Sequence, residues 1–157
     1  MLLVTLLCLA ACYGGGPKPT DAELLARFRA HRPEIATLMK MMEEDRVIRR
    51  IDYDWTDPSN PLSAGISADR ISQYRRILFD IDCPRGFYYD SNTGSVTIIA
   101  WAVGLAGSGA SKSFMYKPVN PVPLVDELDS YQVPAGQDYV LAYRHIEGDW
   151  YLEYDAD

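Results

Sequence analysis

The sequence has no hydrophobic run long enough to cross a membrane as a helix. Its N-terminal apolar stretch, residues 2–11, contains only Leu, Val, Ala, one Thr and one Cys, whereas a membrane span requires about 20 residues. A stretch of about ten is instead typical of the hydrophobic core of a signal peptide. The N-terminus also lacks the Lys or Arg that ordinarily precedes such a core.

Histidine and clustered basic residues are scarce as well. The two histidines, His31 and His145, lie in neither an HExxH pattern nor any other metal-ligand spacing. No Lys- or Arg-rich patch is interleaved with aromatic residues, which argues against a nucleic-acid partner. We therefore expect no metal, no cofactor and no nucleic acid.

The end of the apolar stretch resembles the lipobox of bacterial lipoproteins. Leu9, Ala10 and Ala11 precede Cys12, and in that family the cysteine is lipidated and becomes the first residue of the mature protein. The resemblance implies a signal peptide over residues 1–11 and an acyl anchor on Cys12. It also implies attachment to the bacterial envelope, and because Tyr13 is not Asp, the expected location is the outer membrane facing the periplasm.

This processing predicts a simple domain organisation. Residues 12–20 are rich in Gly and Pro, which predicts a short flexible tether. Residues 21–157 are enough for one domain with its own core and too few for two. With Cys8 removed and Cys12 acylated, Cys83 remains alone, so no internal disulfide can form. We expect Cys83 to be buried and unreactive.

The net charge of −7 is unevenly distributed along the chain. Between residues 12 and 85, 12 basic residues balance 12 acidic ones, whereas from residue 86 onward 3 basic residues face 10 acidic ones. An acidic half of this kind favours a basic partner, although solubility explains the same excess equally well.

The N-terminal half is predicted to be mainly helical. Thr20 and Glu23 form a capping box at the start of one helix, and Pro33 interrupts it near His31. A second helix follows through Met42, and Ser67 caps a third that continues to Ile81. A strand is expected at residues 47–53, between the second and third helices.

The remainder alternates short apolar runs with turn residues, which is typical of an antiparallel meander. Strands are expected at residues 87–90, 95–103, 112–117, 139–146 and 150–154. The strand at 95–103 is apolar on both faces and should be central, with Trp101 on the same face as Ile99. If Gly148-Asp149 is the loop of the last hairpin, Arg144 should lie opposite Glu153. The sequence thus predicts an α+β domain with two to three N-terminal helices on a four- to five-stranded antiparallel sheet, formed mainly by the C-terminal half.

The glycine-rich segment and two potentially catalytic residues do not match any known functional motif. The glycine-rich segment 104–113 lacks the Gly that a phosphate-binding loop places immediately before Lys-Ser, so a flexible hairpin loop is expected. His145 and Asp126 are the residues that a hydrolase would use, but no nucleophile stands in a recognisable pattern with either.

Three prolines, at positions 118, 121 and 123, predict an extended segment that cannot lie in a central strand. Two alternatives remain open for this segment. It protects a sheet edge, or it exposes Val119, Val122 and Leu124 to a partner.

The C-terminal hairpin Arg144–Leu152, together with Gly107–Tyr116, resembles a group of small uncharacterised proteobacterial lipoproteins that share a glycine-rich loop and a Trp-Tyr-Leu hairpin. The resemblance covers most of residues 21–157 and implies no activity. It therefore transfers no catalytic residue.

An anchored, small, acidic domain without a catalytic pattern favours protein binding. We expect an immunity or inhibitor protein that neutralises a secreted toxin, with Lys112, Tyr116, Trp55 and Asp129 as candidate contact residues. Its partners would be the lipid bilayer, through acylated Cys12, and a basic protein. The alternatives are a structural or assembly lipoprotein of the envelope and a small periplasmic hydrolase.

Overall fold

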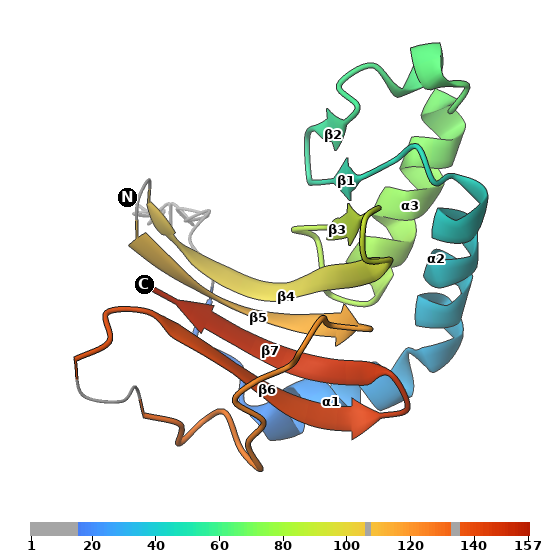
Figure 1. Ribbon diagram of the computed structural model, residues 1–157. Helices are drawn as coiled ribbons and strands as arrows, with labels where there is room; N and C mark the ends of the chain where they lie inside the picture. The colour runs from blue at the N-terminus through green and yellow to red at the C-terminus, as the bar shows by residue number, and fades with distance from the viewer. Residues whose placement is uncertain (1–15, 106–107, 133–135) are drawn as a thin grey trace, which may run out of the picture.

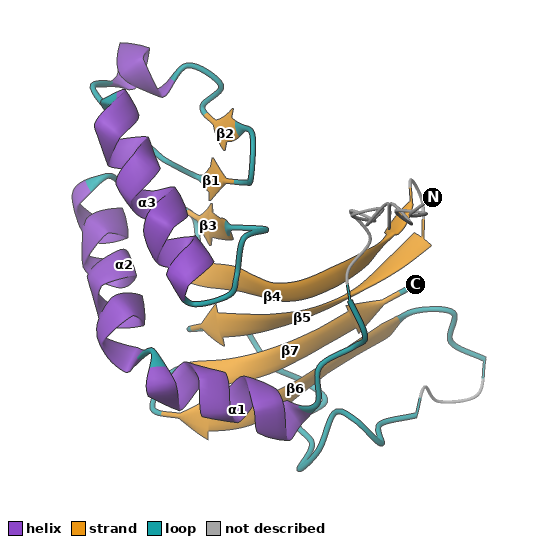
Figure 2. Ribbon diagram, turned by 180° about the vertical axis from the view of Figure 1, so that it is seen from behind, coloured by secondary structure: helices purple, strands orange, loops and turns teal. Residues whose placement is uncertain are grey.

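The computed structural model describes residues 16–105, 108–132 and 136–157. Three α-helices lie on one face of a strongly curved antiparallel sheet, which confirms the α+β class (Figures 1 and 2). The expected signal peptide and Cys12 lie outside the described residues. Within the described part, none of the helices combines the length and apolar character that a membrane span needs.

The helices begin and end close to where the capping residues predict. They are α1 (Asp21–Ala30), α2 (Arg32–Glu44) and α3 (Ala68–Asp80), with a short 3-10 helix at Pro61–Ala64. Thr20 and Glu23 complete the capping box of α1, and Pro33 occupies the first turn of α2. The side chain of Ser67 accepts from the Arg70 amide at the start of α3.

The sheet has seven strands in the order β2-β1-β3-β4-β5-β7-β6, so the expected number of four to five is wrong. The five C-terminal strands are all present, at β3 (Phe87–Asp90), β4 (Ser95–Leu105), β5 (Ser108–Tyr116), β6 (Val140–Glu147) and β7 (Trp150–Ala156). The strand expected at residues 47–53 is replaced by two short strands, β1 (Arg50–Ile51) and β2 (Thr56–Asp57). The chain reverses between them, because the Asp52 amide donates to the Trp55 carbonyl.

One row of paired residues crosses the sheet on its helix-facing side. In register order it comprises Ile51, Phe87, Ile98, Phe114, Leu152 and Arg144. The first five side chains are completely buried. On α1, Phe28 packs against Phe114 with ring centroids 5.5 Å apart, and on α3, Tyr74 packs against Phe87 at 5.6 Å. The core therefore lies between this row and the helices.

Two irregularities in register change which side chains face the helices. A bulge between Ile99 and Trp101 in β4 pairs Trp101 with Lys112, and so moves Trp101 to the helix-facing side. A second bulge, between His145 and Glu147 in β6, pairs Arg144 with Leu152. The Gly148-Asp149 loop is confirmed, but the expected pairing of Arg144 with Glu153 is wrong because of this bulge. The expected central position of β4 is confirmed.

The glycine-rich segment is strand in its described residues. Gly104 pairs with Gly109, so β5 begins earlier than the expected residue 112. A Cβ atom at Gly109 would lie 2.8 Å from the Val103 carbonyl oxygen, which explains why glycine is required at this close approach. The flexible hairpin loop expected within residues 104–113 is therefore wrong for the described residues, which belong to β4 and β5.

Candidate functional site

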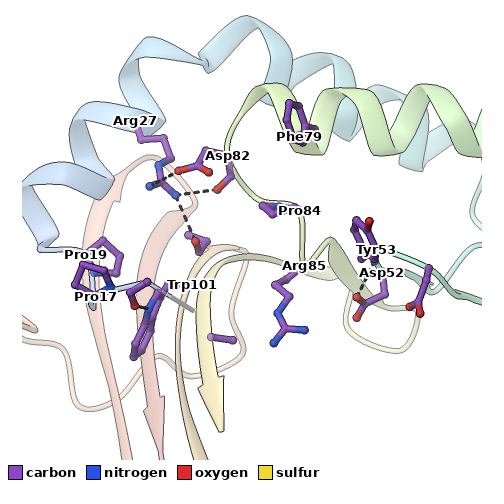
Figure 3. Close-up of a pocket in the computed structure, with 14 residues that line it drawn as sticks. Pro17, Pro19, Arg27, Asp52, Tyr53, Phe79, Asp82, Pro84, Arg85 and Trp101 are labelled. Carbon is purple, nitrogen blue, oxygen red and sulfur yellow. Dashed lines mark hydrogen bonds and ion pairs between the residues drawn. The ribbon is translucent and has the colours of Figure 1, made fainter. Parts of the chain in front are cut away.

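A groove of about 980 Å³ opens where α1, the end of α3, the β1–β2 turn and β4 meet (Figure 3). Its walls are more apolar than polar, and they combine aromatic, proline and small side chains with several charges. A groove of this size and character is typical of a ligand-binding site. The residues that line it come from elements far apart in the chain, so no local sequence pattern could have indicated it.

Trp101 occupies one end of the groove because of the β4 bulge. Its indole Nε1 donates to the Gly16 carbonyl oxygen at 2.9 Å. Gly16, Pro17 and Pro19 line the same end. The described part of the expected tether therefore contacts the sheet, next to the groove.

The charges along the groove are only partly paired. Arg27 forms an ion pair with Asp82 at 2.7 Å and donates to the Asp82 and Ala100 carbonyl oxygens. Asp52 pairs with Arg50 at 2.6 Å. The exposed guanidinium of Arg85 has no partner among the described residues and extends into the open space of Figure 3.

A second polar cluster, which we call the Lys112 clasp, joins Lys112 with Asp21, Asp129 and Arg144. Lys112 Nζ lies 2.8 Å from Asp21 Oδ1 and 2.5 Å from Asp129 Oδ1, and it also donates to the Pro19 carbonyl oxygen. Arg144 Nη1 lies 2.9 Å from Asp21 Oδ2. The clasp thus ties together the tether, α1, β5, β6 and the segment between β5 and β6.

Hydrogen bonds make burial of these charges tolerable. Asp21 Oδ2 also accepts from the Leu128 amide, and Asp129 Oδ2 accepts from the Asp21 amide. Burial alone would raise the pKa of Asp21, but the bonds from Lys112, Leu128 and Arg144 outweigh it and hold that pKa below its ordinary value. Asp21 is therefore a buried carboxylate at neutral pH.

The expected contact role of Lys112 is contradicted by its position. Its side chain is completely buried and cannot touch a partner in the folded domain. The sequence did contain the relevant pattern, because Lys112 lies two residues before the core residue Phe114, on the same face of β5. Asp129 is mainly a member of the clasp, with 26 % of its side chain exposed.

The other two expected contact residues lie in separate places. Trp55 is 50 % exposed beside β2, with the guanidinium of Arg50 5.5 Å from its ring centroid. Tyr116 is partly buried at the end of β5 and packs against Trp150 at 5.1 Å. The structure therefore brings only Lys112 and Asp129 together, and it does so inside the domain.

The proline segment between β5 and β6 protects a sheet edge, as the first alternative predicts, and its three apolar side chains are exposed, while the partner of the second alternative stays a prediction. Leu124 forms a parallel bridge to Tyr143 of β6, where Tyr143 donates to the Pro123 carbonyl and Val125 donates to the Tyr143 carbonyl. The segment crosses β7 and β6 on the side away from α1 before it meets this edge (Figure 1). It protects the edge, and it leaves Val119, Val122 and Leu124 exposed by 64 %, 57 % and 56 %.

Cys83, His145 and Asp126 lie apart from one another, with no contact between them among the described residues. Cys83 is completely buried, as expected, and burial raises the pKa of its thiol to about 12. His145 Nε2 lies 2.9 Å from the Gly148 carbonyl oxygen, and its ring packs on Tyr151. Asp126 is exposed and forms no bond to His145.

No group of three or more potential metal ligands occurs in the part of the chain that the structure describes. Comparisons with protein-family models, with curated proteins and with solved structures found no match. The groove, the Lys112 clasp and the proline segment are therefore the features of the described residues that bear on function.

Proposed function

We propose that this chain is an envelope lipoprotein, anchored through Cys12, that acts by binding a protein. The observation that carries the proposal is the proline strip, by which we mean the exposed side chains of Val119, Val122 and Leu124. Each is more than half exposed, and the three lie close together in sequence on one fixed segment. Clustered exposed apolar residues of this kind typically mark interaction surfaces.

The strip is held in place before any partner arrives. Its backbone is bonded to Tyr143 on the edge of β6. Further along, Leu128 is completely buried and its amide donates to Asp21, while Asp129 joins the Lys112 clasp. A preorganised surface loses little conformational entropy on binding. In this account, Lys112 and Asp129 support the interface and do not touch the partner.

The surroundings of the strip favour a basic partner. Asp126 and Glu127 lie two and three residues after Leu124 and are exposed. The half of the chain that contains the strip also carries the whole negative excess. Acidic groups at the rim of an interface speed association with a positively charged partner. A secreted basic toxin that reaches the periplasm has this chemistry, so we propose the role of an immunity or inhibitor protein.

Anchoring can be tested independently of the partner. Cys12→Ser should move the protein from the membrane fraction to the soluble fraction, because serine lacks the thiol to which the acyl chain is attached and stable anchoring depends on the acyl chains. Mass spectrometry of the wild-type protein should find acyl chains on residue 12. Persistence of the serine variant in the membrane fraction would contradict the anchor.

Position-specific photo-crosslinking tests the proposed interface. A photoreactive side chain at Val122 should give one adduct with a basic protein, in cells that produce the candidate toxin. The matched control is Leu62, which is 72 % exposed on the short 3-10 helix and should give no such adduct. Serine at both Val119 and Leu124 should abolish the adduct from Val122. The same adducts from both positions, or none from either, would refute the proposal.

A further inference from the structure

The groove of Figure 3 lies beside the point where the anchor must leave the domain. Gly16 and Pro17 line it, and the bond from Trp101 to the Gly16 carbonyl oxygen holds the chain there. Two further contacts fix the next residues. Lys112 donates to the Pro19 carbonyl oxygen, and Lys18 Nζ lies 4.7 Å from the centroid of the Tyr154 ring.

The distance from the groove to the bilayer is limited by covalent geometry. Cys12 precedes Gly16 by four residues, and an extended chain spans at most about 3.3–3.6 Å per residue. The Cα atoms of Cys12 and Gly16 are therefore no more than about 14 Å apart. Once the acyl chains of Cys12 are inserted, this end of the domain lies against the lipid headgroups.

The rim of the groove has the side chains that suit such a position. Phe79 is 74 % exposed at the end of α3, and Tyr53 is 57 % exposed in the β1–β2 turn. Aromatic residues of this kind are enriched where proteins meet the headgroup layer.

The charges that line the groove match a headgroup in sign. Arg27 and Asp52 are neutralised by Asp82 and Arg50, respectively. Arg85 and Asp54 also line the groove, and neither has an ion-pair partner among the residues the structure describes. Phosphatidylethanolamine carries a phosphate and an ammonium group, which complement the guanidinium and the carboxylate.

We propose that the groove is a second membrane contact, in which Arg85 binds the phosphate of a phospholipid headgroup while Phe79 and Tyr53 enter the headgroup layer. This inference rests on the proposed anchoring of Cys12. It also explains the arrangement of the domain. The groove includes β4, whereas the proline strip lies at β6, three strands further across the sheet. Contact through the groove would leave the strip free for its partner.

Lipid quenching of a site-specific fluorophore measures this orientation. The acylated protein is reconstituted in vesicles of phosphatidylethanolamine and phosphatidylglycerol that contain a lipid spin-labelled on its headgroup. A fluorophore on Phe79→Cys should be quenched at least three-fold more strongly than one on Val122→Cys. The native Cys83 is completely buried and leaves the introduced thiol as the labelling site. Equal quenching, or stronger quenching at position 122, would overturn the proposal.

The role of Arg85 has a matched control on α3. With the fluorophore at Tyr53→Cys, Arg85→Gln should lower the quenching at least two-fold. Arg76→Gln, an exposed arginine that lies outside the groove, should leave it unchanged. An unchanged signal in Arg85→Gln would show that this side chain holds no headgroup.

The quenching experiment distinguishes failure of the headgroup contact from failure of the proposed anchor or of the proposed protein interface. The vesicles contain no protein partner, so failure of the proline strip has no effect on the quenching. If mass spectrometry finds no acyl chain on Cys12, the anchor proposal fails. Cys8 and Cys12 are then replaced by Ser and the chain is attached through an N-terminal His tag to a nickel-chelating lipid, so the introduced cysteine stays the labelling site and the same comparison of positions 79 and 122 still decides whether the groove contacts the headgroups.

Discussion

Lys112→Met should destabilise the domain strongly. The side chain is completely buried, so its charge acts only within the fold. Lys112 is completely buried and lies 2.8 Å from the carboxylate of Asp21, which is itself 1 % exposed. Methionine has a similar unbranched shape, so the change removes charge and hydrogen bonds with little change in packing.

The expected loss follows from what remains around Asp21. Breaking a buried ion pair by removing one partner costs about 3–5 kcal/mol, because the other charge is left uncompensated. In this variant, Arg144 and the Leu128 amide still bond to Asp21 Oδ2. We therefore expect a loss at the lower end of this range, about 3 kcal/mol in the free energy of unfolding. In a domain of this size the melting temperature should fall by about 6–12 °C.

Equilibrium unfolding in urea, measured on the Cys12→Ser form, provides the assay. Lys117→Met is the matched control, because Lys117 is 53 % exposed and lies 3.8 Å from Asp149, and it should change the stability by less than about 0.5 kcal/mol. Combining Lys112→Met with Asp21→Asn should cost less than the sum of the two single losses. A loss below about 1 kcal/mol in Lys112→Met would refute the clasp as a source of stability.

The pH dependence of this loss has a definite sign. The pKa of Asp21 is lower in the folded protein than its ordinary value of 3.8. Its ion pair therefore stabilises the fold above that pH, and the contribution disappears as the pH falls through the folded-state pKa. The difference between wild type and Lys112→Met should shrink in acid. A difference that stays constant down to pH 2 would contradict the assignment.

Further predictions concern Glu153, Cys83 and two glycines. Burial raises the pKa of the Glu153 carboxyl above its ordinary value of 4.5. The folded protein therefore loses stability as the pH rises through this raised pKa and Glu153 becomes charged. Glu153→Gln should raise the melting temperature at pH 8 and leave it unchanged below pH 4. The Cys83 thiol, with its pKa raised to about 12, should react with maleimide only in denaturant, and fast labelling of the native protein would contradict this. Gly86→Ala should prevent folding or cost more than about 3 kcal/mol, because its Cβ would lie 1.7 Å from the Ile51 carbonyl oxygen. Gly94→Ala, also at positive φ but with open space around it, should cost only about 1 kcal/mol in the same thermal unfolding assay.

Local features of the fold were predictable because their causes are local. The cap of α1 depends on Thr20 and Glu23, three residues apart, and the Gly148-Asp149 loop depends on the conformational freedom of adjacent turn residues. The two bulges were not predictable. Each inserts one residue into a strand, and each changes the face of the side chains beyond it.

The candidate sites were harder to predict because they depend on tertiary contacts. Arg27 on α1, Arg85 between α3 and β3, and Trp101 on β4 line one groove, and nothing in their spacing along the chain indicates this. The burial of Lys112 could have been inferred from its alternation with Phe114. Its partners could not, because Asp21 lies 91 residues away. The position of the proline segment outside a central strand was predictable from its three prolines, whereas the exposure of Val119, Val122 and Leu124 was one of two open alternatives.

Binding of the basic partner that crosslinks at Val122 tests the central claim most directly. Calorimetric titration should compare the wild type with the variant in which Val119, Val122 and Leu124 are all serine. The comparison is made at a temperature at which unfolding experiments show both proteins to be fully folded. We predict that the affinity of the serine variant is at least about 100-fold lower, since losing buried apolar contacts at a preorganised interface costs several kcal/mol. An affinity equal to that of the wild type would contradict the proposed role of the strip.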